Sequence, residues 1–226
     1  FLDLQVDQHL PDNFTTDELQ VEQLNPAELV KDQQKLQSVF SLLVTAHYRT
    51  RPSDFAYLLD SEDVRLYALR VNTAIVAVLA INQEGGFSPE LSTQVYRGVR
   101  RPKGHLLAQT LCFHGGIETA AQLNYARIMR IAVHPAMQRM GLGQFLVDSV
   151  IESESHRGMD LIGCSFSAEV GLLEFWRAAG FSLLRTGFSR DHVSASYAVV
   201  LGRALSGEGQ LLVNRLQVIL GRNLPV

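Results

Sequence analysis

Two closely spaced glycines lie between a strand-like run and a helix-like run, where a ligand could bind. They are Gly141 and Gly143 in the segment QRMGLG (138–143), which follows an apolar run ending at Pro135. A glycine-rich turn at a helix N-terminus exposes backbone N–H groups and the positive end of the helix dipole. Because glycine has no side chain, a ligand can approach the backbone there. The segment is therefore a candidate loop for binding a diphosphate.

Two common phosphate loops do not fit this segment. A Walker loop requires a lysine directly after its last glycine, and none follows Gly143. A dinucleotide-binding fingerprint requires a third glycine where Leu146 stands. The pattern that remains is Q/R-x-x-G-x-G after a strand.

Basic residues gather in two short stretches, YRGVRRPKGH (96–105), which contains no acidic residue, and HYRTRP (47–52). Such basic islands in a chain of net charge −3 either bind RNA phosphates locally or are solvated loops. The candidate RNA contacts in them are Arg49, Arg51, Arg97, Arg100, Arg101 and Lys103.

These groups must be positioned by helices and strands, and the periodicity of apolar residues predicts a mixed α/β sheet. The expected order begins with a helix over 25–48 with Asn25 as its N-cap, a short helix over 52–60, a hairpin over 64–84 turning at Asn72–Thr73, and a strand over 125–135. A helix over 141–158, a strand over 159–166, a helix over 169–180, strands over 182–188 and 196–204, and a helix from about Gly209 follow. Residues 1–24 are expected to be an irregular lead-in, 25–204 one α/β domain with an insertion around 85–124, and 205–226 a C-terminal helix that begins a truncated tail.

The composition sets limits on the class of protein. With 226 residues, 46% of them hydrophobic, the chain can bury the core of one large domain. It has no apolar stretch near the roughly 20 residues that cross a membrane, so no membrane partner is expected. Cys112 and Cys164 are isolated and belong to no CxxC, so we expect buried small residues, no metal site and a cytoplasmic protein. The chain does not begin with Met, and we expect an excised piece of a longer protein.

Two longer segments carry a family resemblance. RIAVHPAMQRMGLGQFLV (130–147) resembles motif A of the GCN5-related N-acetyltransferases, the GNAT superfamily, and LIGCSFSAEVGLLEFWRAAGF (161–181) resembles the motif that follows it. From about Ala46 onward, AHYRTRPSDFAYLLD, GHLLAQTLCFHGG and these two motifs together resemble the tRNA(Met) cytidine acetyltransferases. The resemblance implies a GNAT fold, a mixed central β-sheet flanked by helices, with acetyl-CoA as cofactor and tRNA as partner. In that family ATP or GTP would bind only to a helicase-like module that this chain does not contain.

The resemblance also implies a set of cofactor contacts. They are Ile131, Ala132, Val133, Gln138, Arg139, Met140, Gly141, Leu142, Gly143, Gln144, Glu169 and Arg177. Residues 131–133 would pair with the pantetheine amides, and the Val133 N–H would stabilise the oxyanion. Trp176 stands where many GNAT enzymes have a tyrosine acid, and either core packing or cofactor contact would account for it.

Acetylation of a cytosine amine needs a base, because the nitrogen is cationic after it attacks the thioester. The candidates are His47, Glu169, a solvent-facing His134 and a helix-capping His114. We favour His47 with Tyr48 as its partner, and Glu169 is the rival. The expected function is transfer of acetyl from acetyl-CoA to the exocyclic amine of a cytidine in RNA, the wobble cytidine of elongator tRNA(Met). The alternatives are a GNAT that acetylates protein lysine or N-terminal amines, and a non-catalytic RNA-binding module.

Overall fold

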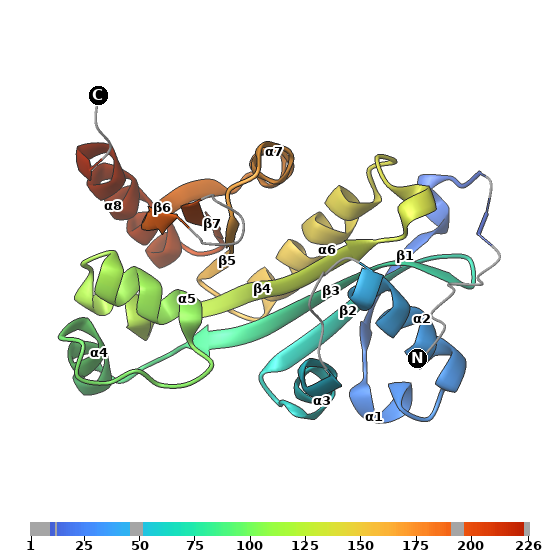
Figure 1. The fold of residues 1–226 in the computed structure, drawn as a ribbon, viewed down its shortest axis with the longest axis horizontal. Coiled ribbons are helices and arrows are strands. Elements are labelled where there is room, and N and C mark those ends of the chain that lie inside the picture. Colours follow the sequence, from blue (N-terminus) through green and yellow to red (C-terminus); the bar gives the residue numbers. More distant parts are fainter. Residues whose placement is uncertain (1–9, 12, 46–51, 191–196, 224–226) are drawn as a thin grey trace. The chain divides into compact units, whose positions relative to one another are not determined.

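The computed structural model describes residues 10–11, 13–45, 52–190 and 197–223. In this part of the chain a seven-stranded sheet has the order β1-β2-β3-β4-β5-β7-β6 (Figure 1). Its strands are β1 (Leu19–Leu24), β2 (Val64–Val71), β3 (Ala74–Gly85), β4 (Asn124–Val133), β5 (Leu161–Ser167), β6 (Ser182–Arg190) and β7 (Tyr197–Ala204). The β4–β5 pair is parallel, whereas β1–β2, β5–β7 and β6–β7 are antiparallel, so the predicted mixed sheet is confirmed.

Eight α-helices accompany the sheet in the described part of the chain. They are α1 (Pro26–Leu29), α2 (Gln33–Thr45), α3 (Pro52–Asp60), α4 (Pro89–Tyr96), α5 (Leu106–Gln109), α6 (Leu142–His156), α7 (Val170–Ala178) and α8 (Gly207–Asn223). Three 3-10 turns, η1 (Thr16–Glu18), η3 (Glu118–Gln122) and η4 (Pro135–Met137), and one π-helical turn, η2 (Thr110–His114), complete the order. The chain forms two compact units, 1–81 with 128–150 and 82–127 with 151–226.

The first unit corrects the predicted start of the domain. Residues 19–24 are not irregular, because β1 pairs antiparallel with β2 from Leu19 opposite Val71 to Leu24 opposite Leu66. The single helix expected over 25–48 is two helices. Asn25 caps α1 as predicted, and its side chain accepts from the Ala27 N–H at 2.9 Å. A second cap interrupts the helix, since the Asp32 carboxylate accepts from the Lys35 N–H at 2.9 Å and α2 starts at Gln33.

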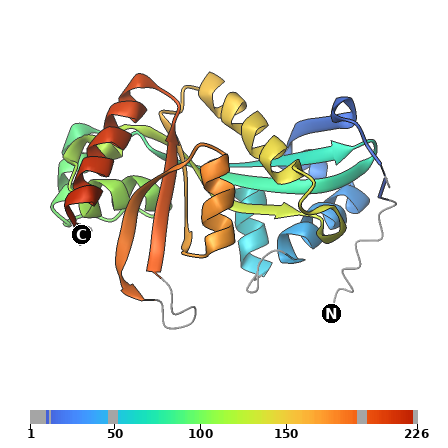
Figure 2. The same cartoon turned by 90° about the horizontal axis from the view of Figure 1, so that it is seen from above.

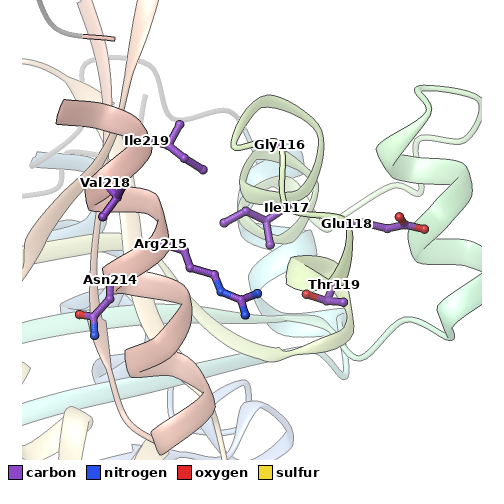
Figure 3. A pocket seen from close by; sticks show the side chains of 8 residues that line it. All are labelled: Gly116, Ile117, Glu118, Thr119, Asn214, Arg215, Val218 and Ile219. Carbon is purple, nitrogen blue, oxygen red and sulfur yellow. The ribbon is translucent and has the colours of Figure 1, made fainter. Parts of the chain in front are cut away.

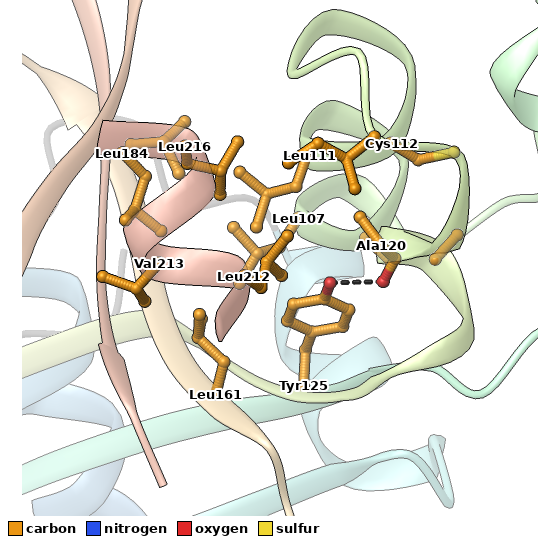
Figure 4. Close-up of a cluster of buried hydrophobic side chains, with 14 of the residues drawn as sticks. Leu107, Leu111, Cys112, Ala120, Tyr125, Leu161, Leu184, Leu212, Val213 and Leu216 are labelled. Atoms are coloured by element: carbon orange, nitrogen blue, oxygen red, sulfur yellow. Dashed lines mark hydrogen bonds between the residues drawn. The ribbon is translucent and has the colours of Figure 1, made fainter. Parts of the chain in front are cut away.

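The second unit has a core built on the inserted segment. Residues 85–124 hold α4, α5, η2 and η3, and the expected helical piece of this insertion is α5 followed by η2. Figure 4 shows Leu107 and Leu111 of this piece facing Leu212 and Leu216 of α8, and Cys112 and Val213 belong to the same buried cluster. The Tyr125 hydroxyl donates to the Ala120 carbonyl within the same core. Figure 2 shows β6 and β7 as a hairpin, against which α8 packs. Cys112 and Cys164 are free and buried, as predicted.

A buried carboxylate fixes the insertion to the sheet in this unit. Glu84, near the end of β3, is 1% exposed and forms an ion pair with Arg127 of β4. Its second oxygen accepts from the Leu107 N–H at 2.6 Å and from the Ala108 N–H at 3.4 Å. Both N–H groups lie in the first turn of α5, where a helix offers them no carbonyl acceptor of its own. Next to it, the Asn82 amide donates to the Gly104 carbonyl at 2.9 Å. One charged side chain therefore links two strands to the first turn of a helix.

We expect Glu84→Gln to destabilise the protein by about 2 kcal/mol, because a buried hydrogen-bonded charge is lost beside Arg127. Denaturant unfolding measures this change. The matched control is Glu22→Gln, since Glu22 pairs with Lys35 at 3.0 Å but both side chains are about a third exposed. An exposed ion pair contributes less than about 1 kcal/mol. Equal losses in the two variants would show that Glu84 stabilises no more than a surface ion pair does.

Candidate functional site

The segment that follows β4 is held by its own backbone and by β3. The His134 N–H donates to the Val76 carbonyl at 2.8 Å, and Pro135 then begins η4. The His134 Nδ1 accepts from the Ala136 N–H at 3.2 Å, so the imidazole caps this short turn. Met137 is 3% exposed and anchors the turn in the core. These contacts hold residues 134–137 in place at the end of β4, directly before the glycine segment.

His134 differs from the prediction. It is 9% exposed rather than solvent-facing, and burial lowers the pKa of its imidazole. Because Nδ1 is already occupied by the Ala136 N–H, a structural role accounts for this residue.

The glycine segment adopts a backbone that leaves room for a ligand. Arg139 has φ +64° and Gly141 has φ +81°, both in the left-handed region. This conformation costs about 1–2 kcal/mol for a residue with a side chain, and such strain concentrates at ligand sites. A Cβ added at Gly141 would meet nothing within 4 Å. At the start of the segment, the Gln138 side-chain amide donates to the Val133 carbonyl at 3.3 Å.

The first turn of α6 offers free donors beside this open space. The Phe145 N–H donates to the Gly141 carbonyl at 3.0 Å, so Gly141 is the N-cap and has no side chain to cap the helix. Among the described residues, no group accepts from the N–H of Leu142, Gly143 or Gln144. The Gln144 side chain turns to Asp148, whose two carboxylate oxygens lie 3.2 Å from its Nε2. Free N–H groups at the positive end of a helix, next to an uncapped glycine, fit a pyrophosphate.

The strand before this segment supplies the other predicted contacts. The parallel ladder joins Tyr125–Arg127 of β4 to Leu161–Gly163 of β5, and Ile131–Val133 lie beyond it along β4. Ala132 is buried, whereas Ile131 and Val133 are half-buried. Met140 and Arg139 are exposed at the tip of the segment. The predicted contacts from 131 to 144 therefore form one continuous stretch in the first unit.

The α7 residues belong to the second unit. Glu169 is exposed at the N-cap position of α7, where its side chain forms no capping hydrogen bond. Arg177 is exposed in the last turn. Trp176 is 3% exposed, and its ring centroid lies 4.9 Å from those of Phe175 and Phe181. Of the two explanations for Trp176, core packing accounts for it.

The remaining predicted residues fall in three places. His47, Tyr48, Arg49 and Arg51 lie outside the described residues. In the basic stretch, Arg97 is the C-cap of α4 and Lys103 is exposed. Arg100 and Arg101 line a pocket with Phe113 and His114. His114 stands in the last turn of η2 and caps no described helix through its side chain. No local pattern of residues indicated that Phe113 and His114 would adjoin the arginines.

A second hollow, of about 600 Å³, lies between α8 and residues 116–119. Figure 3 shows Ile117 pointing toward α8 and Arg215 reaching toward Thr119. None of the residues predicted from the sequence lies in it. Within the described ranges there is no cluster of three or more metal-binding side chains, and no described helix is long and apolar enough to cross a membrane.

The fold class is GNAT, and solved acetyltransferase structures share this architecture. The ribosomal-protein-S18-alanine N-acetyltransferase from Escherichia coli has a TM-score of 0.55 and 16% identity, covering 83% of this chain and 94% of its own. A chain of the NatC complex bound to Gag peptide and CoA has a TM-score of 0.56 and 13% identity, covering 83% and 99%. At these identities the similarity establishes the fold.

The sequence comparisons assign the chain to a narrower group of proteins than the fold does. The family model described as GNAT acetyltransferase 2 matches residues 38–155, and the chain belongs to this family. The tRNA(Met) cytidine acetyltransferase TmcA of Nitrosococcus halophilus is 43% identical over 195 residues, covering 86% of this chain and 26% of that protein. The protein of the same name from Haloferax volcanii is 35% identical over 210 residues, covering 93% of this chain and 28% of its own. The chain thus spans roughly a quarter of the length of these relatives.

Proposed function

We propose that this chain is the acetyl-transferring core of an RNA cytidine acetyltransferase, which uses acetyl-CoA and modifies the wobble cytidine of elongator tRNA(Met). The observation that carries the proposal is the intact glycine segment 138–143, with its free N–H groups, in a chain 43% identical to a protein named for that activity. A tRNA substrate implies a reaction in the cytoplasm. No observation favours protein amines as the acceptor.

The cofactor would lie along β4 and the start of α6. Acetyl-CoA supplies the acetyl group as a thioester. The N–H groups of Leu142, Gly143 and Gln144 would bind its pyrophosphate, because they have no other acceptor among the described residues. The exposed Arg139 guanidinium would add a positive charge there. Gln138 would hold the segment through its bond to Val133, and Met140 would cover the ligand.

The reacting end would be held by the strand. Residues Ile131, Ala132 and Val133 would pair with the pantetheine amides in the manner of a β-strand. The Val133 N–H would donate to the thioester oxygen as negative charge develops on it. Glu169 and Arg177 of α7 would provide polar cofactor contacts, since both are exposed. These roles follow the GNAT resemblance.

The acceptor amine needs a proton acceptor after it attacks. The exocyclic amine of cytosine is unprotonated at neutral pH, so no base is needed before the attack. After it, His47 would take the proton from the cationic nitrogen, with Tyr48 beside it in sequence, and the acetyl C–S bond would break to release the CoA thiolate. Histidine suits this role because its ordinary pKa is about 6.5. Glu169 is the rival base.

Nucleoside mass spectrometry of tRNA from cells that lack the gene tests this function. We expect acetylated cytidine to disappear from elongator tRNA(Met) and to return when the parent gene is restored. Acetylated cytidine at unchanged abundance in the deletion strain would overturn the proposed substrate.

A further inference from the structure

We propose that the pocket beside the basic stretch is a subsite for one unpaired nucleotide of RNA, with its base stacked on Phe113 and Arg101 and its phosphate bound by Arg100. The pocket has a volume of about 190 Å³ and lies between the end of α4 and the α5–η2 segment. This inference rests on the proposed function, because it assigns part of the RNA recognition to these residues.

The pocket presents an aromatic ring together with a guanidinium group. The Arg101 guanidinium carbon lies 5.5 Å from the centroid of the Phe113 ring. Phe113 is 38% exposed and Leu106, which also lines the pocket, is 53% exposed. Unpaired bases stack on aromatic rings and on guanidinium planes, and the pocket has one of each, Phe113 and Arg101. The exposed apolar surface of Phe113 and Leu106, with the Arg101 guanidinium over the ring, suits a base better than it suits a carboxylate.

The backbone fixes these groups before any ligand binds. The N–H groups of Val99 and Arg100 both donate to the Gln94 carbonyl, at 2.9 and 3.3 Å, so the turn after α4 is closed. Gly98 has φ +73°, and a Cβ there would lie 3.0 Å from a ring carbon of Phe113. The chain therefore passes directly against the ring. Glycine allows this approach, which holds Arg100 and Arg101 beside Phe113.

Two arginines and one histidine line the pocket. The His114 ring lies edge-on to Phe113, with 4.8 Å between centroids. Burial, together with the positive charges of Arg185 and Arg101, lowers the pKa of His114. The described residues that line the pocket include no Asp or Glu. A phosphate would therefore meet positive charge unopposed by lining carboxylates.

The contribution of the Arg100 and Arg101 charges to RNA binding can be tested separately from that of the rest of the basic stretch. Arg97 and Lys103 belong to the same stretch but do not line the pocket. The test is binding of a labelled single-stranded oligoribocytidylate to the 226-residue chain, followed by fluorescence anisotropy over a salt series. Arg100→Ala with Arg101→Ala should lower the affinity at least about tenfold and reduce the salt slope by roughly 0.7 for each phosphate that is no longer bound. Arg97→Ala with Lys103→Ala removes the same charge and should have a clearly smaller effect. Equal effects of the two pairs would overturn the pocket in favour of diffuse charge.

The stacking contribution needs its own variants. Phe113→Leu should weaken the oligonucleotide roughly 5- to 150-fold, which corresponds to the usual range for one stacked base, and Phe113→Tyr should bind as the parent does. Phe113→Trp adds a fluorescent ring at the pocket, and the oligonucleotide should quench it. Trp176, the single tryptophan of the chain, is 3% exposed and should not respond in the parent.

The outcomes distinguish the subsite from the proposed function. Unchanged affinity in Phe113→Leu, absence of quenching in Phe113→Trp, or no binding by the parent chain overturns the subsite. Equal competition by a polyglutamate peptide against the oligonucleotide in the parent and in Phe113→Leu also overturns it, because the pocket would then bind an acidic peptide without using the ring. Oligonucleotide binding that depends on the ring at residue 113 would support the subsite. If the full-length protein at the same time acetylates no cytidine, the proposed function is refuted.

Discussion

Gly141→Glu should abolish acetyl-CoA binding while the fold stays intact. The space next to Gly141 is open, with nothing within 4 Å of an added Cβ, and a glutamate side chain would enter the place proposed for the pyrophosphate. Its carboxylate would also repel the phosphates and compete for the free N–H groups of α6. We expect the affinity to fall at least about a thousandfold, or about 4 kcal/mol, in calorimetric titration.

Gly158→Glu is the matched control for backbone strain and charge. Gly158 has φ +76°, its Cβ position is also open, and it follows the C-terminal end of α6 rather than the start. The two variants therefore share the same new side chain and a similar conformational cost. Gly158→Glu should bind acetyl-CoA as the parent does, with the same circular dichroism. Loss of binding in both variants, or native binding in Gly141→Glu, would contradict the pyrophosphate role of the segment.

His47→Ala should lower turnover of the full-length enzyme by roughly 10²–10⁴-fold, the usual contribution of a general base. Acetyl-CoA affinity should hardly change, since His47 is not among the proposed cofactor contacts, which lie on β4, at the start of α6 with the segment before it, and on α7. The base must be neutral to accept a proton, so the parent rate should fall as the pH drops through a pKa near 6.5. The variant should lose this limb of the pH profile. Steady-state rates from about pH 5 to 9 measure both effects.

Glu169→Gln separates the rival base from His47. Glu169 is exposed at the start of α7, where its carboxylate could accept the proton in place of His47. If His47 is the base, Glu169→Gln should keep the limb near pH 6.5 and retain most of the turnover. A His47→Ala enzyme with full turnover and an unaltered pH profile would remove His47 from the mechanism and leave Glu169 as the better candidate.

The glycine segment and the hairpin could be predicted because their signals are local. Pro135 stops the strand, Gly141 supplies the left-handed residue before α6, and Asn72 takes the left-handed position, φ +54°, in the predicted two-residue turn. The α1–α2 break has a local signal as well, in Asp32, but a continuous apolar period across it favoured one helix.

Other features depend on residues far apart in the chain. β1 is a short edge strand whose conformation depends on pairing with β2, some 45 residues later, and its own alternation is weak. Glu84 needs Arg127 and the start of α5 to explain its burial. The Phe113 pocket brings together the end of α4 and the η2 turn. Nothing in the order of residues indicates these neighbours.

Transfer of isotope-labelled acetyl from acetyl-CoA to purified tRNA by the full-length protein tests whether the enzyme acetylates cytidine. The tRNA is digested and its nucleosides are separated by mass, with the Gly141→Glu protein as the inactive control. We predict mass-shifted acetylcytidine at the wobble position of elongator tRNA(Met) with the parent and none with the control. Label on protein amines with none on cytidine would contradict the account.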